Sequence, residues 1–353
     1  MLFLTCSQNL AATLFNCMHH SLLSILPPHK LKVVEAALQQ TFGTSTVEDI
    51  ELMTRGLSPA LVYKIQVNGQ AYILRLVMAI NELIDPAREY ACLRAAADAG
   101  IAPAVLYADA NAAVSICRFI AGPPIWVGLP EKDVQLKSIA EKVKAIHALP
   151  LFPPLINFLE GMTHFRDRFM EMNMFPESAT AEHFAHFDQI KSIYPINEEL
   201  VSSHNDLNPA NVLFDGEKIW LIDWEASFKN DRYVDLAIVA LYFAANEQHI
   251  DTFLTAYFGE TPTALQKAKF YLMRQVVFLY YGTIFLRMAA EMKETHDQDM
   301  KVPTLPEVKK MMGKGEVNLG SYEGKILYGK MLMQEALTEM KLPAFEQALS
   351  LLN

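Results

Sequence analysis

Apolar and polar residues alternate in the N-terminal third of the chain, a pattern typical of strands buried on one face. The alternation is clearest over 61–67, and a second extended run covers 70–77. Asn68-Gly69 lies between them and is the residue pair that most strongly favours a two-residue hairpin turn. With an extended run at 47–53, this predicts a small antiparallel sheet. Two further short strands are predicted at 104–108 and 113–119.

Helical periodicity dominates the rest of the chain. Asp85 followed by Pro86 is typical of a helix start, and Gly100 is a plausible end for that helix. Further helices are predicted over 30–42, 133–149, 234–245, 250–258, 264–292 and 322–341. Residues 151–200 are expected to be helical with breaks at prolines. Residues 293–321 are polar and contain Gly and Pro, which predicts a loop.

A cluster of helix and strand breakers at 121–124 is the predicted boundary between two parts of the molecule. The length of 353 residues also favours about two domains. We therefore expect an α+β protein with a helical N-terminal extension at 1–43, a small sheet-and-helix lobe at 44–121 and a larger helical lobe at 122–353.

The composition excludes several classes of protein. Hydrophobic residues make up 52% of the chain, which rules out wholesale disorder. The net charge of −10 argues against a nucleic-acid partner and suits a neutral or cationic small molecule. Four cysteines without a C-x-x-C pair predict neither a disulfide framework nor a zinc site, which favours a cytoplasmic protein.

The apolar N-terminal segment 1–26 has no basic start and no apolar run of 18 residues. It therefore predicts neither a signal peptide nor a membrane span. An amphipathic helix packed on the body is favoured, and a true start at Met18 remains an alternative.

The most informative stretch is 203–211, which matches the catalytic-loop pattern H-x-D-x-x-x-x-N from His204 through Asp206 to Asn211. Asp223 follows an apolar strand, and an Asp-Gly turn at 215–216 separates the two segments. Phosphoryl transfer requires a carboxylate that accepts the proton of the attacking hydroxyl, and oxygen ligands for Mg²⁺. The pattern therefore predicts Asp206 as the base, with Asn211 and Asp223 as metal ligands.

The same residue types also occur as ordinary turn and capping residues. A lone H-x-D would favour that structural interpretation. The full combination, with an acid placed after a strand and returned by a hairpin, favours the catalytic one.

The segments His204-Asn205-Asp206-Leu207 and Ile222-Asp223-Trp224-Glu225 resemble the choline/ethanolamine kinase branch of the aminoglycoside-phosphotransferase-like kinases. The downstream segment 230–237 is similar too, and the order of elements extends the resemblance over roughly 45–345. The resemblance implies a bilobal, protein-kinase-like fold that binds ATP and Mg²⁺ between its lobes. It also implies that His204 and Asp235 are structural, because they would brace and anchor the catalytic loop.

The resemblance implies further roles in the N-terminal lobe. The turn that contains Ser58 would cover the nucleotide phosphates, although a single glycine makes it equally an ordinary hairpin loop. Arg75 would contact phosphate, and Glu89 would pair with Arg75. The segment 117–120, with Arg118 and Ile120, would form the hinge that meets adenine through its backbone. Solvated charges on a strand and a helix are the alternatives for Arg75 and Glu89.

A quaternary ammonium is bound by aromatic faces, usually beside a carboxylate. The candidates downstream of the motif are Trp224, Tyr233, Tyr242, Phe243, Tyr280, Tyr281 and Phe285, with Glu225 and Glu247 as acids. Trp224, Tyr242, Tyr281 and Glu225 are the ones we assign to the substrate. For any single aromatic residue, a core role is the alternative. Ala226 and Tyr242 depart from the family pattern, which has Tyr and an acid there.

These observations predict an ATP- and Mg²⁺-dependent kinase that phosphorylates the hydroxyl of a small alcohol, with choline or a related amino alcohol favoured. An aminoglycoside- or thiamine-type phosphotransferase of the same fold is an alternative, as is a catalytically silent binding module. A protein kinase is disfavoured because the chain has Asp223-Trp224-Glu225 in place of D-F-G and lacks A-P-E.

Overall fold

The structure is a computed structural model that describes residues 25–53, 60–293, 296–297 and 299–353. The N-terminal segment 1–24 and the turn with Ser58 lie outside the described residues. The chain forms two compact units. Unit 1 comprises the described residues up to Pro130 together with Ala210–Phe228, and unit 2 comprises Glu131–Pro209 and the described residues from Lys229 to Asn353.

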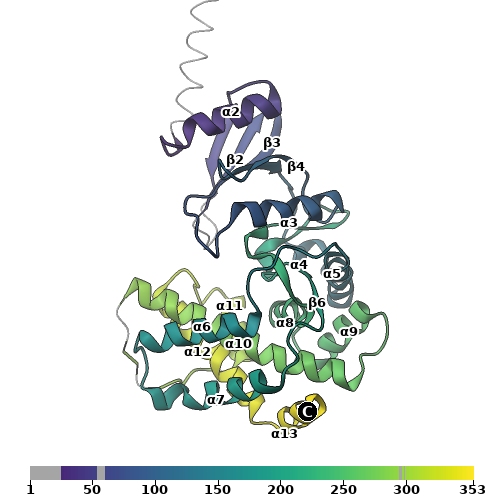
Figure 1. The fold of residues 1–353 in the computed structure, drawn as a ribbon, viewed down its shortest axis with the longest axis vertical. Helices are drawn as coiled ribbons and strands as arrows, with labels where there is room; N and C mark the ends of the chain where they lie inside the picture. Colours follow the sequence, from purple (N-terminus) through teal and green to yellow (C-terminus); the bar gives the residue numbers. More distant parts are fainter. Residues whose placement is uncertain (1–24, 54–59, 294–295, 298) are drawn as a thin grey trace, which may run out of the picture. The chain divides into compact units, whose positions relative to one another are not determined.

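Unit 1 is built on an antiparallel sheet (Figure 1). The strand order in this sheet is β1-β2-β3-β5-β4. Its strands are β1 (Asp49–Leu52), β2 (Leu61–Val67), β3 (Gln70–Leu76), β4 (Val105–Asp109) and β5 (Val114–Arg118). The predicted hairpin turn is confirmed, because Asn68 and Gly69 join β2 to β3 with φ of +51° and +72°. All five strands correspond to predicted ones.

Two helices complete this part of unit 1. The helix α2 (Leu31–Phe42) shares a hydrophobic core with the alternating apolar residues of β2 and with β3 and β5. The helix α3 (Pro86–Asp98) begins as predicted, with the Asp85 carboxylate accepting a hydrogen bond from the Ala87 N–H at 2.9 Å. The short helix α4 (Ile125–Gly128) was not predicted.

The segment Ala210–Phe228 belongs to unit 1 by its contacts, although the sequence analysis assigned it to the C-terminal lobe. It contains the hairpin β7 (Val212–Phe214) and β8 (Ile219–Leu221), and the Leu221 N–H donates to the carbonyl of Ile101 at 3.0 Å. Gly122 allows the chain to pass this hairpin closely, since a Cβ atom there would lie 1.9 Å from the Phe214 carbonyl oxygen.

Unit 2 is mostly helical (Figure 1). Its helices are α5 (Lys132–His147), α6 (Phe158–Glu171), α7 (Glu177–Ile193), α8 (Arg232–Phe243), α9 (Glu247–Phe258), α10 (Ala264–Met292), α11 (Leu305–Gly313), α12 (Tyr322–Met340) and α13 (Pro343–Leu352). The long helix α10 packs against α6, α8, α12 and α13. The strand β6 (Leu200–Ser203) pairs with β9 (Phe228–Asp231) and leads into the predicted catalytic loop.

The helix α11 corrects the prediction that 293–321 is a loop. Thr304 and Glu307 form a capping box, in which the Glu307 carboxylate accepts from the Thr304 N–H at 2.8 Å, and Pro306 stands in the first turn. Val308 is the buried residue of this helix, which is only nine residues long and therefore offers a short apolar pattern. The helix α13 was also not predicted.

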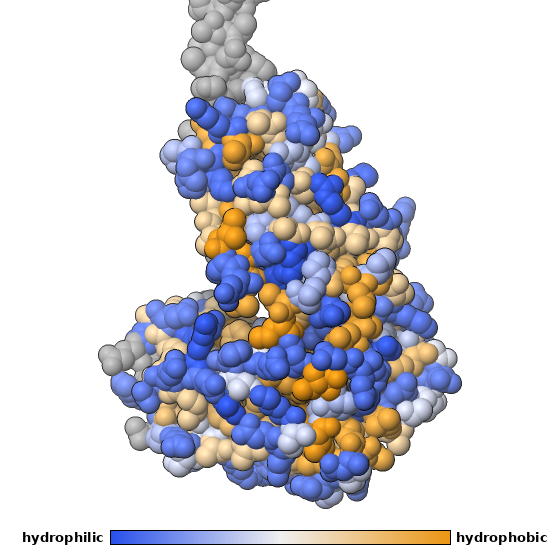
Figure 2. All heavy atoms as spheres, viewed as in Figure 1, coloured by the Kyte–Doolittle hydropathy of each residue, from blue (hydrophilic) through white to orange (hydrophobic). Residues whose placement is uncertain are grey.

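Both units expose a mixed surface. Hydrophilic residues are interspersed with apolar ones over the face that Figure 2 shows. Among the described residues, every helix is too short or too polar to cross a lipid bilayer.

Candidate active site

The predicted catalytic loop follows β6 in unit 2, and buried side chains hold it in place. Asp235, which is completely buried, accepts hydrogen bonds from the backbone N–H of His204 at 2.9 Å and of Asn205 at 2.7 Å. His204 is also completely buried, and its Nδ1 accepts from the Asp206 N–H at 3.3 Å. The contacts that the resemblance implied for His204 and Asp235 are therefore present.

Asn205 explains the local shape of this loop. Its φ of +64° lies in the left-handed region, which Asn adopts more readily than most residues. Its side-chain oxygen accepts hydrogen bonds from the Ser203 hydroxyl at 2.9 Å and from the Asn230 amide at 2.7 Å. Asp206 therefore directly follows Asn205, whose side chain these hydrogen bonds hold in place.

Asp235 is connected to two further helices through His147 at the end of α5. The distance from His147 Nε2 to Asp235 Oδ2 is 3.1 Å, and the Tyr257 hydroxyl lies 2.7 Å from His147 Nδ1. Burial would raise the pKa of Asp235, but the hydrogen bonds and charges of His147 and His204 lower it, so Asp235 remains an anion. His147 thus links Asp235 to Tyr257. Sequence analysis did not select Tyr257.

The Asp206 carboxylate accepts hydrogen bonds from two side chains within unit 2. The Tyr281 hydroxyl donates to Oδ1 at 3.1 Å, and the Asn208 amide nitrogen lies 3.1 Å from each carboxylate oxygen. The sequence analysis did not select Asn208, although it lies two residues after the predicted base. Asp206 is therefore held in a defined orientation, as the predicted role of general base requires.

In unit 1, Arg75 on β3 lies among three carboxylates. Its Nε donates to Glu89 at 2.9 Å, its Nη1 lies 3.7 Å from Asp223 Oδ1, and its Nη2 bonds Glu225. Burial would lower the pKa of Arg75, but the three negative charges outweigh it and raise the pKa. Burial raises the pKa of Glu89, although Arg75 opposes this effect. The predicted pairing of Arg75 with Glu89 is present.

A second arginine, Arg88, anchors the segment that follows Asp223. Its guanidinium is buried and donates to the backbone carbonyls of Glu225 at 3.1 Å and Ser227 at 3.3 Å. The sequence offered no signal for this role, because the contact joins residues 137 positions apart. Arg88 thus ties α3 to the segment after Asp223, whereas Glu89 ties α3 to Arg75 on β3.

The predicted metal ligands lie at the two open ends of the β7–β8 hairpin. Val212 pairs with Leu221, and the Ile222 N–H donates to the carbonyl of Asn211 at 3.1 Å, which sets Asn211 beside the residue before Asp223. Asp223 has φ of +66°, a conformation that Asp tolerates better than most residues and that is common at functional sites.

The side chains of Asn211 and Asp223 fit a magnesium ion. Amide and carboxylate oxygens are hard donors, and Mg²⁺ is usually held by one or two carboxylates together with substrate phosphates and water. Within the described residues there is no group of three or more His, Cys, Asp and Glu side chains with the arrangement of a metal site. The donor set suits an ion shared with a nucleotide better than a closed structural site.

The residues that the sequence analysis considered for substrate binding lie in different surroundings. Trp224 is a correction, because its side chain is 2% exposed and its indole N–H donates to the Leu221 carbonyl at 3.1 Å, which makes it a core residue. The Glu225 carboxylate bonds Arg75, so the structure groups Glu225 with Arg75 and Glu89 rather than with the aromatic residues. Glu247 is exposed on α9 and lies 3.3 Å from Arg274.

Tyr242 and Tyr281 come together, with ring centroids 5.8 Å apart and an edge-to-face arrangement. Tyr280 packs edge-on against Tyr281 at 5.3 Å. Other candidates are core residues, since Tyr233 is fully buried and Phe285 packs against Tyr328 at 4.8 Å. An aromatic cluster, Tyr242, Tyr280 and Tyr281, therefore lies beside the Asp206 carboxylate.

The hinge remains a prediction. Arg118 ends β5 and its N–H donates to the carbonyl of Ala104 at 2.9 Å, while Ile120 follows the strand half-buried.

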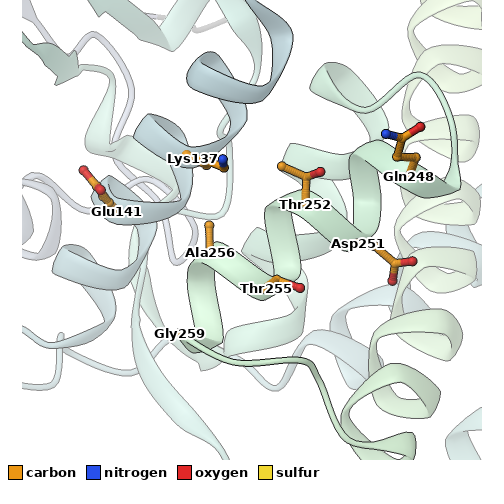
Figure 3. Close-up of a pocket in the computed structure, with 8 residues that line it drawn as sticks. All are labelled: Lys137, Glu141, Gln248, Asp251, Thr252, Thr255, Ala256 and Gly259. Carbon is orange, nitrogen blue, oxygen red and sulfur yellow. The ribbon is translucent and has the colours of Figure 1, made fainter.

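A surface hollow of about 830 Å³ lies between α5 and α9 in unit 2, and Figure 3 shows residues such as Lys137, Thr252 and Gly259 around it. The predicted site residues do not line this hollow.

Comparison with known proteins shows the family of this chain. Residues 49–271 match the family model described as a phosphotransferase enzyme family. The chain belongs to this family. It is 24% identical over 208 residues to Protein LicA of Haemophilus influenzae, a match that covers 56% of this chain and 75% of that protein.

Solved structures share the fold of this phosphotransferase. A choline/ethanolamine kinase family protein from Mesorhizobium loti has a TM-score of 0.66 at 19% identity, with 92% of this chain and 99% of that chain covered. The choline kinase LicA from Streptococcus pneumoniae has a TM-score of 0.57 at 19% identity, with 74% and 92% covered. The predicted α+β, protein-kinase-like fold and the family resemblance are confirmed.

Proposed function

We propose that this phosphotransferase moves the γ-phosphate of ATP to the hydroxyl of a small alcohol, with choline or a related amino alcohol as acceptor. The observation that carries the proposal is the Asp206 carboxylate, which is anchored through its loop to Asp235 and lies beside the aromatic cluster of Tyr242, Tyr280 and Tyr281. Such rings can bind a cationic ammonium group.

Each group then has a specific part in the reaction. Asp206 orients the acceptor hydroxyl and takes its proton as the oxygen attacks the γ-phosphorus and ADP leaves. Arg75, fixed by Glu89 and Glu225, contacts the nucleotide phosphates. Asn211 and Asp223 would hold Mg²⁺, which supplies neutralisation of the phosphate charge when it is bound.

The acceptor is the least constrained part of the proposal. The relatives named as choline or choline/ethanolamine kinases support an amino alcohol, and the aromatic cluster supports a cationic head group. We assign no carboxylate to the cationic head group beside the aromatic cluster, because Glu225 bonds Arg75 and Glu247 bonds Arg274. Neutral or larger acceptors therefore belong in the test.

The test is ADP release with ATP and Mg²⁺ over choline, ethanolamine, thiamine, aminoglycosides and sugars. We expect the highest kcat/KM with choline or ethanolamine. Asp206→Asn should lower kcat by about 10²- to 10⁴-fold and leave ATP affinity unchanged, because it removes the base alone. The exposed Asp167→Asn is the matched control and should behave as the unaltered protein.

Three outcomes would contradict the proposal. Preference for an aminoglycoside, thiamine or a sugar would replace the acceptor class. Absence of turnover with every acceptor would favour a binding module. Full turnover in Asp206→Asn would remove Asp206 as the base.

A further inference from the structure

The sequence assigned the ring of Tyr281 to the acceptor, but the structure gives its hydroxyl a separate contact. That hydroxyl donates to Asp206 Oδ1 at 3.1 Å, across 75 positions of sequence. A hydrogen bond to an ionised carboxylate is among the stronger hydrogen bonds in proteins. The contact therefore bears on the group that takes the proton, whatever molecule the ring contacts.

Tyr281 is well placed to fix the orientation of another group because its own position is constrained. Its side chain is 8% exposed, and the rings of Tyr242 and Tyr280 pack edge-on against it at 5.8 and 5.3 Å. The next residue, Gly282, lies against α12, where a Cβ atom would come within 2.6 Å of Met333 Cγ and 3.1 Å of the Gly329 carbonyl oxygen. The phenol ring thus packs against two other rings, and the contact of α10 with α12 fixes the backbone beside it.

The Tyr281 hydroxyl also remains a donor throughout the range of ordinary assays. Burial, together with the negative charge of Asp206, raises the pKa of Tyr281 well above its usual value of 10. The phenol therefore keeps its proton and cannot act as a competing base.

We propose that Tyr281 is a positioning residue that orients the Asp206 carboxylate for proton transfer through its hydroxyl group, independently of any contact of its ring with the acceptor. The inference rests on the proposed function, because it concerns the base of that reaction. Misplacement of a reacting group by about 1 Å can cost about 10²-fold in rate, so loss of this hydrogen bond should act on kcat.

Tyr281→Phe tests the inference because it keeps the aromatic ring and removes only the hydroxyl. We expect kcat to fall about 10- to 100-fold while KM for the acceptor and the affinity for ATP stay within about twofold. Tyr271→Phe is the matched control, since this tyrosine lies on the same helix and its hydroxyl donates to the Glu339 carbonyl at 2.6 Å. It should keep the kcat of the unaltered protein.

A double-mutant cycle separates positioning from a general loss of structure. In the Asp206→Asn background, Tyr281→Phe should lower the residual single-turnover rate by less than twofold, because the carboxylate that it orients is gone. A merely structural role would lower the rate equally in both backgrounds. The thermal midpoint of each variant confirms that it is folded.

The outcomes distinguish the inference from the proposed function. An increased acceptor KM with unchanged kcat, or an equal loss in both backgrounds, would overturn the inference and leave Asp206 as the base. Unchanged kcat and KM in Tyr281→Phe would overturn it as well. Full turnover in Asp206→Asn, or no turnover in the unaltered protein, would overturn the proposed function itself.

Discussion

At the scale of single residues, the contacts of Arg75 show why arginine suits this position better than lysine. Its planar guanidinium bonds Glu89 through Nε and Glu225 through Nη2 at once, which a lysine ammonium cannot do with the same geometry. Three carboxylates surround one guanidinium, so this part of unit 1 keeps an excess of negative charge. Such an excess suits a divalent cation near Asp223.

His183 on α7 is a residue whose effect belongs to stability rather than catalysis. It is 2% exposed, and burial lowers its pKa to about 4 from the usual 6.5. The unfolded chain therefore binds a proton between pH 6.5 and 4 that the folded chain excludes. His183 therefore does not lower the free energy of unfolding above pH 6.5. As the pH falls from 6.5 towards 4, the free energy of unfolding decreases, because the unfolded chain gains a proton that the folded chain does not.

His183→Leu should remove this pH dependence. The interval from 6.5 to about 4 corresponds to about 3 kcal/mol, so the variant should gain up to about that much over the unaltered protein by pH 4, and little at pH 7.5. Urea unfolding of both proteins at a series of pH values measures the difference. The exposed His164 on α6 offers a control substitution to Leu. A stability difference between His183→Leu and the unaltered protein that is constant from pH 7.5 to 4 would contradict the explanation.

At the scale of elements, the contact of α10 with α12 is the packing that supports Tyr281. The two helices approach closely at Gly282 and Gly329, where a Cβ atom on Gly329 would lie 2.7 Å from Leu286 Cγ and 3.0 Å from the Gly282 carbonyl oxygen. Backbone on the facing helix cannot move aside as the end of a side chain can. The spacing of the helices is therefore set by these two glycines.

Gly329→Ala should destabilise unit 2 by about 1–3 kcal/mol, because the added methyl group overpacks this contact. Gly313→Ala is the matched control, since nothing lies within 4 Å of its Cβ position at the end of α11, and it should be neutral or slightly stabilising. Thermal unfolding followed by circular dichroism compares the two. A Gly329→Ala variant as stable as Gly313→Ala would show that the helices separate without cost.

Most elements were predictable where the sequence carries a local signal. The Asn68-Gly69 turn, the Asp85-Pro86 helix start and the boundaries of α10 all follow from short-range chemistry. The helix α11 was missed because it is only nine residues long and lies in a polar segment that contains Gly and Pro. The assignment of 210–228 to unit 1 depends on long-range backbone contacts that no local pattern encodes.

The candidate site shows the same limit. The spacing of Asp206, Asn211 and Asp223 predicted the motif, and the β7–β8 register sets Asn211 beside Ile222, the residue before Asp223. The sequence could not show that Trp224 faces the core or that Glu225 bonds Arg75. The burial of Trp224 and the ion pair of Glu225 depend on residues that are distant in the sequence, which a local pattern does not reveal.

At the scale of the whole molecule, the parts of the proposed reaction are divided between the two units. Unit 1 carries Arg75 and the predicted metal ligands, whereas unit 2 carries Asp206 and the aromatic cluster. The chain passes from unit 2 into unit 1 between Pro209 and Ala210, within the predicted catalytic motif. This motif therefore contributes residues to both units.

The most direct measurement of the central claim is phosphorus NMR of the protein incubated with ATP, Mg²⁺ and choline or ethanolamine. We expect the signal of a new phosphomonoester to grow in step with ADP, to require Mg²⁺, and to be nearly absent with Asp223→Asn, which removes the carboxylate that we propose as a metal ligand. Release of inorganic phosphate alone, or equal transfer by Asp223→Asn and the unaltered protein, would contradict the account.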